Sequence, residues 1–205
     1  MTAPDLPAEL KAALEARLQG LSRTDAASRA ALISNTYRDG GGSGAIRSES
    51  DALAYALARM PATYAAVIAS LNALDEIAPQ LAPTSLLDVG AGPGTATWAA
   101  AEAFPSLQRF TLLDANAALR ALALDLVRNS VRLRGIDYRQ GEARAALADA
   151  AASDLVIASY VIAEISASER GALAEALWKK PGIRCWSSSP ARPRATRASL
   201  SFADN

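Results

Sequence analysis

A glycine-rich segment near the middle of the chain carries the residue types best suited to chemistry. Residues 86–95 read LLDVGAGPGT, so Gly90, Gly92 and Gly94 follow directly on an apolar run. Glycines let a backbone turn tightly and approach a ligand closely, and the first amides of a following helix face that ligand. Asp88 would place a carboxylate at the mouth of this site, and Thr95 stands where a dinucleotide-binding loop has its third glycine. The pattern predicts a ligand-binding loop; the alternative is a tight strand-to-helix turn.

A second acidic residue stands where the next predicted strand ends. Asp114 closes the run LLD twenty residues after Gly94. An acid at the tip of the second strand of such a fold is well placed to accept hydrogen bonds from ribose hydroxyls. The alternative is an ordinary cap for the helix that begins near Asn116. The glycine loop and Asp114 in register are stronger together than either feature alone.

This combination resembles the S-adenosylmethionine-dependent methyltransferases with a Rossmann-like fold. The resemblance implies that the three glycines pass close to the amino-acid end of the cofactor and that Asp114 binds its ribose. It also implies an acidic residue near the adenine, at Glu142, and a fourth strand whose tip, Ser159 and Tyr160, faces the reacting methyl group. Alternatively, Glu142 is a first-turn helix acid and Tyr160 lies at the edge of the core.

The candidate cofactor-binding residues are Asp88, Gly90, Ala91, Gly92, Gly94, Asp114, Ala115, Glu142, Ser159 and Tyr160.

The composition excludes several kinds of catalysis. The chain has no His and one Cys, Cys185, which excludes a disulfide framework, a His-based metal site and Ser–His or Cys–His catalysis. The fourth strand is not followed by the Asp/Asn-Pro-Pro-Tyr/Phe arrangement used to methylate exocyclic base amines. We therefore expect no metal and assign no catalytic residue. Catalysis would depend on positioning an already activated methyl group for in-line attack.

The elements that must position these residues form an α/β chain with a helical N-terminal region. Residues 6–78 show helical periodicity, interrupted by the run GGGSG at 40–44. Ser48 or Ser50 caps one of its helices, and Pro61 starts or kinks the segment that follows. After Pro83, apolar strands alternate with amphipathic helices, which predicts a parallel Rossmann-like sheet. Strands are expected at 85–89, 109–113, 136–139 and 155–159, and helices at 95–104, 117–129, 142–151 and 167–178.

The sequence segments around the glycine loop are more specific for one protein family than the loop itself. The segments ALAYALARMPATY at 52–64, SLLDVGAGPGT at 85–95 and ASYVIAEI at 158–165 resemble bacterial relatives of the mitochondrial small-ribosomal-subunit assembly methyltransferase family. The resemblance covers roughly residues 5–178 and implies a role with small-subunit ribosomal RNA. Tyr55 and Arg59 share a helix face by their spacing and could touch RNA or the cofactor domain. The alternative is a core tyrosine and a solvated arginine.

The C-terminus departs from this family. The resemblance implies a fifth strand followed by a Pro-Gly segment, and further on a cysteine cluster associated with iron–sulfur binding. Here residues 183–205 instead read as a basic irregular tail, and the last 30 residues hold six basic side chains and one acidic one. We hypothesise a shift of reading frame, because from Cys185 onward the frame one nucleotide earlier can encode such a strand. The sheet would then be incomplete, with an open edge at its fourth strand. The alternative is a genuine tail that contacts RNA.

The whole chain has 21 basic and 21 acidic residues, so its net charge does not indicate a nucleic-acid or membrane partner. No apolar stretch reaches the length of a membrane span and no signal peptide is evident, so we expect a cytoplasmic protein. We divide it into a helical region (1–82), an S-adenosylmethionine-binding domain (83–182) and the tail (183–205). The function expected is that of a methyltransferase-like protein associated with small-subunit ribosomal RNA or the small ribosomal subunit. The alternative is a non-catalytic assembly factor that keeps the cofactor site, and the glycine spacing disfavours a nicotinamide oxidoreductase.

Overall fold

A parallel sheet of five strands forms the centre of the protein. The computed structural model describes residues 4–19, 28–29, 31, 43–159, 161, 167–179 and 183–187. The strands are β1 (Ser85–Val89), β2 (Arg109–Asp114), β3 (Asp137–Gln140), β4 (Leu155–Ser159) and β5 (Ile183–Ser187). Their order is β3-β2-β1-β4-β5, and every pair is parallel. The structure thus confirms the α/β prediction and places the first four strands within one residue of their predicted bounds.

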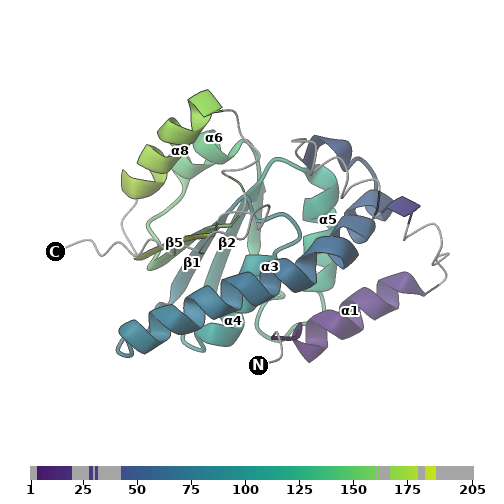
Figure 1. Ribbon diagram of the computed structural model, residues 1–205, viewed down its shortest axis with the longest axis horizontal. Coiled ribbons are helices and arrows are strands. Elements are labelled where there is room, and N and C mark those ends of the chain that lie inside the picture. Colours follow the sequence, from purple (N-terminus) through teal and green to yellow (C-terminus); the bar gives the residue numbers. More distant parts are fainter. Residues whose placement is uncertain are drawn as a thin grey trace.

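Helices cover both faces of the sheet (Figure 1). One layer contains the long helix α3 (Glu49–Ile77) with α4 (Thr95–Ala103) and α5 (Ala117–Leu126), and the other contains α6 (Ala143–Asp149) and α8 (Ala167–Lys179). Alternate residues of a strand point to opposite faces. Leu86 therefore packs in the α3–α4–α5 layer, whereas Leu87 and Val89 pack with α6 and α8. Both faces of β1 and β4 are buried, which explains their nearly continuous apolar sequences.

The amino ends of β1 and β4 are joined by one carboxylate. Asp154 directly precedes β4, and its Oδ2 accepts hydrogen bonds from the N–H of Thr84 at 2.8 Å and of Ser85 at 3.1 Å. The Thr84 hydroxyl donates to the same oxygen at 2.7 Å. In return, the Ser85 hydroxyl accepts from the Asp154 N–H. These bonds fix the pairing of two strands that lie far apart in the sequence.

Helix α3 is one continuous element, not two. Ser48 caps it: its hydroxyl accepts from the Asp51 N–H, and the Asp51 carboxylate accepts from the Ser48 N–H. Pro61 lies inside the helix, so of the two alternatives given for it, the start of a new segment is wrong and a kink stays a prediction. The buried face of α3 packs on α4 and α5, and these contacts hold the helix together across the missing N–H of Pro61. By length and composition α3 could cross a membrane, but ten of its residues are buried within the protein.

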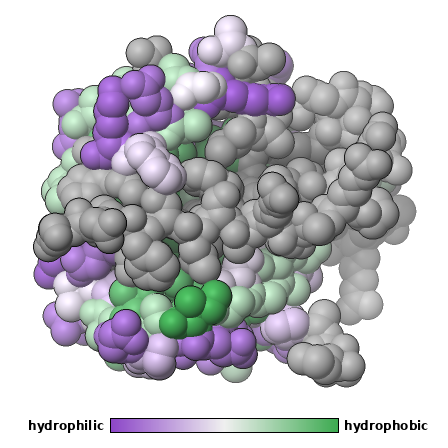
Figure 2. Space-filling view, turned by 60° about the vertical axis from the view of Figure 1, so that its left-hand side comes forward, coloured by the Kyte–Doolittle hydropathy of each residue, from purple (hydrophilic) through white to green (hydrophobic). Residues whose placement is uncertain are grey.

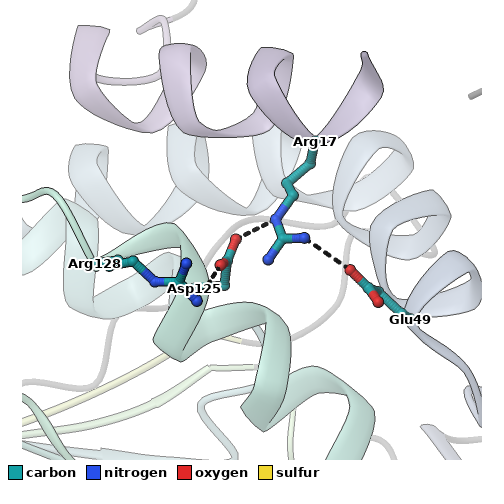
Figure 3. A network of polar contacts seen from close by, with 4 residues as sticks. All are labelled: Arg17, Glu49, Asp125 and Arg128. Atoms are coloured by element: carbon teal, nitrogen blue, oxygen red, sulfur yellow. Dashed lines mark hydrogen bonds and ion pairs between the residues drawn. The ribbon is translucent and has the colours of Figure 1, made fainter. Parts of the chain in front are cut away.

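The first helix joins the same core. Helix α1 (Ala8–Leu18) buries Leu10 and Leu14 in the apolar cluster that also contains residues of α3 and the sheet. An ionic network fixes its end (Figure 3). The Arg17 guanidinium contacts Asp125 of α5 and, at 2.9 Å, Glu49 of α3, while Arg128 contacts Asp125 at 2.9 Å. Of the helical region predicted before the run GGGSG, residues 20–27, 30 and 32–39 lie outside the described residues.

The start of the C-terminal tail is a strand, which corrects our expectation of an irregular segment. β5 pairs with β4 from Leu155–Ile183 to Ser159–Ser187, so the sequence as it stands covers the edge of β4. The sequence IRCWS offers a β-branched and an aromatic residue but also a charge, and Pro181-Gly182 precedes it instead of following it. A single Arg in a five-residue run was enough to hide the strand. Residues 188–205, on which the hypothesis of a frame shift now depends, lie outside the described chain.

Exposed large hydrophobic side chains are few in the described part of the protein: Ile77, Val131 and Trp178. They belong to three separate segments of the chain. On the face that Figure 2 presents, one small strongly hydrophobic area lies near the lower edge, with hydrophilic residues below it. Scattered apolar residues of this kind are normal on a protein surface and need no partner.

Candidate cofactor site

A cavity of about 400 Å³ opens at the carboxyl ends of β1, β2 and β4. The strand order reverses between β1 and β4, and open parallel sheets bind ligands in the crevice at such a point. Its volume lies within the usual range for small-molecule sites. It is lined by Ser43, Gly44, Tyr55, Arg59, Met60, Thr63, Gly90, Ala91, Gly92, Pro93, Thr95, Asp114, Ala115, Asn116, Leu119, Glu142, Ala143, Ser159 and Val161.

The glycine loop adopts a conformation that requires glycine at one position above all. Gly90, Gly92 and Gly94 all have positive φ, between 55° and 81°. At Gly90 a Cβ atom would lie 2.6 Å from Val161 Cγ2 and closer still to its Cβ. At Gly92 the nearest atom to such a Cβ would be Leu119 Cδ1, at 3.9 Å. Gly90 is therefore fixed both by its φ and by the chain that follows β4.

Asp114 holds the loop from the tip of β2. Its Oδ2 accepts from the Gly92 N–H and its Oδ1 from the Asn116 N–H, both at 2.8 Å. Burial raises the pKa of the Asp114 carboxyl, and the nearby negative charge of Glu142 adds to this. The cap of α5 is not Asp114 but Asn116, whose Oδ1 accepts from the Leu119 N–H at 3.0 Å. Asp114 thus lines the cavity and also orients Gly92.

Two residues of the site were missed in the sequence. The buried Tyr138 hydroxyl donates to the Gly92 carbonyl at 2.7 Å, so Gly92 is held at both its N–H and its carbonyl group. The Asn116 amide donates to the carbonyls of Ser43 at 2.8 Å and Ile46 at 2.9 Å, which ties the segment before α3 to the cavity. The signal for Tyr138 was only that it is the single large apolar residue in the polar strand DYRQ. Asn116 was visible only as a helix cap.

Asp88 does not lie at the mouth of the cavity, contrary to our expectation. It is fully buried on β1, and its side chain faces α4, where Oδ2 accepts from the Thr97 hydroxyl at 2.8 Å. Its Oδ1 has no hydrogen-bond partner among the described residues. Burial raises the pKa of Asp88 to about 7, and the charge of Asp114 acts in the same direction. Asp88 and Gly94 do not line the cavity; they belong to the support beneath the loop.

The other candidate residues divide between the cavity and the part of the chain that the structure does not describe. Glu142 precedes α6 without capping it through its side chain, and it lines the cavity together with Ala115 and Ser159. Tyr160 lies outside the described residues. In the described chain no three His, Cys, Asp or Glu side chains gather as a metal site. The described lining residues offer acidic and hydroxyl groups and one arginine.

Helix α3 supplies the wall opposite the sheet. Tyr55, Arg59 and Thr63 follow one another at four-residue spacing, which places them on one helix face, and all three line the cavity. Tyr55 and Arg59 are both half-buried. Both residues line the cavity beside the glycine loop, as expected for contact with the cofactor domain. Tyr55 also packs against the main apolar core, as its alternative predicted, and contact with RNA stays a prediction. The N-terminal region is therefore part of this site.

The fold and the glycine loop together define a class, the Rossmann-like methyltransferase domain. An O-methyltransferase family protein from Burkholderia thailandensis matches with a TM-score of 0.55 and 14% identity, over 67% of this chain and 41% of that one. The SAH-bound methyltransferase PaMTH1 from Podospora anserina matches with a TM-score of 0.50 and 11% identity, over 90% of this chain and 64% of that one. At these identities the likeness concerns the fold.

Residues 49–183 match the mitochondrial small ribosomal subunit Rsm22 family, and the chain belongs to this family. A human relative, the mitochondrial ribosome assembly protein METTL17, is 28% identical over 137 residues. The match covers 63% of this chain but only 29% of the human protein. The family resemblance inferred from the sequence is confirmed.

Proposed function

We propose that this protein binds S-adenosylmethionine in the cavity and acts, as a methyltransferase-like protein, in assembly of the small ribosomal subunit. Membership of the Rsm22 family and the human relative named for ribosome assembly support the second half of this proposal. The methyltransferase fold and the SAH-bound neighbour support the first. Association with small-subunit ribosomal RNA and a cytoplasmic location belong to the same proposal.

The single observation that carries cofactor binding is the joint position of the glycine loop and Asp114 in the cavity wall. The Asp114 carboxylate accepts backbone hydrogen bonds from Gly92, Asn116 and Ala115, and since a carboxylate has about four acceptor positions it can still accept from a ribose hydroxyl. The charges also fit: Asp114 and Glu142 against Arg59 leave a net negative lining, and S-adenosylmethionine carries a net positive charge. When bound, the cofactor supplies an activated methyl group; the protein binds it, orients it and shields it from water.

Binding of S-adenosylhomocysteine to the purified chain, measured by calorimetry, tests this directly. We expect Asp114→Ala to weaken binding at least tenfold, because it removes both the ribose acceptor and the anchor of Gly92. Asp137→Ala is the matched control, since this exposed carboxylate of β3 pairs only with Arg139 among the contacts described and lies outside the cavity lining. If the folded wild-type chain shows no binding, the proposal fails.

A non-catalytic assembly factor that keeps the cofactor site is the second candidate. It is favoured by the lack of an assigned general base and of the amine-methylating motif after β4. Transfer of labelled methyl groups from S-adenosylmethionine to small-subunit RNA separates the two functions. Transfer supports a methyltransferase, whereas cofactor binding and RNA binding without transfer support the assembly factor.

A further inference from the structure

The glycine loop has little left to offer an anionic group, which is unexpected for a loop at the start of a helix. Its N–H groups are already used within the protein: Gly90 and Ala91 donate to the Leu113 carbonyl, and Gly94 donates to Ala91. The Gly92 N–H donates to Asp114. Pro93 has no N–H to give. The N–H groups of these loop residues are therefore engaged within the protein, and a ligand carboxylate needs donors from other lining residues.

The only cationic side chain among the described lining residues is Arg59. It extends from α3, whereas the acidic residues Asp114 and Glu142 stand at the end of β2 and before α6. Among the described lining residues the charges are thus divided, with the two acidic residues on the side of β2 and β3 and the basic residue on α3. A ligand with an anionic and a cationic part would be oriented by this division.

We propose that Arg59 binds the α-carboxylate of the cofactor's amino-acid moiety, which makes α3 a cofactor-recognition helix. This inference rests on the proposed cofactor binding. A planar guanidinium matches a carboxylate with two parallel hydrogen bonds, and Arg59 is half-buried, so water weakens the pairing less than at an exposed site. With the ribose on Asp114, this contact fixes the ligand on both sides of its sulfur atom.

Two ligands that differ by the amino-acid moiety test this assignment. S-adenosylhomocysteine carries the carboxylate, whereas 5′-methylthioadenosine keeps the adenosine and sulfur but lacks the amino-acid part. We expect Arg59→Met, which retains much of the aliphatic stem, to weaken binding of S-adenosylhomocysteine at least tenfold. Its affinity for 5′-methylthioadenosine should stay within twofold of the wild-type value. Arg59→Lys should lie between the two, because an ammonium keeps the charge but not the bidentate geometry.

Arg109→Met is the matched control. Arg109 is an exposed residue at the opposite end of β2 from Asp114, and its replacement should leave both affinities unchanged. The assignment is overturned if Arg59→Met binds S-adenosylhomocysteine as the wild type does, or if it loses both ligands equally, which would mark Arg59 as a shaping residue. Either result leaves the proposed function standing. A wild-type chain that binds neither ligand would overturn the proposed function itself.

Discussion

The carboxyl ends of β1 and β2 differ sharply from that of β4, although all three border the same cavity. At β1 and β2, Gly92 is held by Asp114 on one side and by Tyr138 on the other, so the loop is fixed by the protein itself. At β4 the described chain contributes the hydroxyl of Ser159 and the apolar Val161. The side that would hold the cofactor is preorganised, whereas the described residues on the side that would face the reacting group offer a single hydroxyl. This contrast makes cofactor binding the firmer half of the proposed function.

The largest effect on the β1 side of the cavity should come from the substitution Gly90→Ala. The alanine would have to keep the positive φ of Gly90, which costs about 1–2 kcal/mol. Its Cβ would also overlap Val161, which adds about 1–3 kcal/mol. We expect the free energy of unfolding, measured with urea, to fall by about 4 kcal/mol. Gly92→Ala is the control, because it has the positive φ without the overlap and should lose only about 1–2 kcal/mol. Equal losses in the two variants would show that Val161 does not restrict Gly90.

A change of pH should have a smaller effect on stability, through the titration of Asp88. The folded protein keeps this carboxyl protonated up to a pKa of about 7, whereas the unfolded chain releases the proton near 3.8. The folded state therefore binds more protons between these values, and its stability falls as pH rises through that window. Since one pKa unit corresponds to about 1.4 kcal/mol, we expect a loss of roughly 3 kcal/mol between pH 5 and pH 8.

Asp88→Asn isolates this contribution because it is neutral at both pH values and nearly isosteric. Urea unfolding of both proteins at pH 5 and pH 8 is the measurement. Asp114 remains in both, so the part of its titration that does not depend on the charge of Asp88 cancels from the difference. Parallel pH profiles for the wild type and Asp88→Asn would mean that Asp88 is not the group that titrates.

Tyr138→Phe should have a more modest effect on the β2 side. It removes the donor to the Gly92 carbonyl and should cost about 1 kcal/mol of stability. Because the loop is then held on one side only, we expect the affinity for S-adenosylhomocysteine to fall about threefold. Tyr64→Phe, at a buried tyrosine of α3 outside the cavity lining, should not change that affinity. An unchanged affinity in Tyr138→Phe would mean that Asp114 alone positions the loop.

The smallest effect is expected at β4. Ser159→Ala should leave S-adenosylhomocysteine binding within about twofold, since the loss of one hydroxyl that is not shown to hold the loop is worth well under 1 kcal/mol. The measurement is the same calorimetric titration. A loss as large as that of Asp114→Ala would abolish the contrast between the two sides of the cavity.

The part of the fold that could be predicted is the part with unbroken local patterns. The apolar runs of β1 and β4, each ended by a change to polar or glycine residues, gave the correct strand bounds. β5 was missed because Arg184 interrupts its pattern, and α3 was divided because Pro61 is tolerated where packing on α4 and α5 supports the helix. Local rules fail where tertiary contacts decide.

The candidate site shows the same division. The glycines and Asp114 lie in one short motif and its strand neighbour, so spacing alone located them. Asp88 was placed on the correct strand but on the wrong side, since alternation says that it points away from Leu87 without saying which face meets the cavity. Tyr138 and Asn116 act on residues 46 and about 70 positions away, and no local pattern carries that information.

The pairing of β1 with β4 also determines when the sheet can form during synthesis of the chain. The contact of Asp154 with Ser85 spans 69 residues, whereas β2 begins much sooner after β1. At a synthesis rate of about 5–20 residues per second, β1 lacks its second neighbour, β4, for roughly 3–14 s. During that interval one edge of β1 and the apolar residues around it are uncovered. Slow elongation between residues 85 and 155 would therefore lengthen the period in which a nascent chain of this family is most exposed to aggregation.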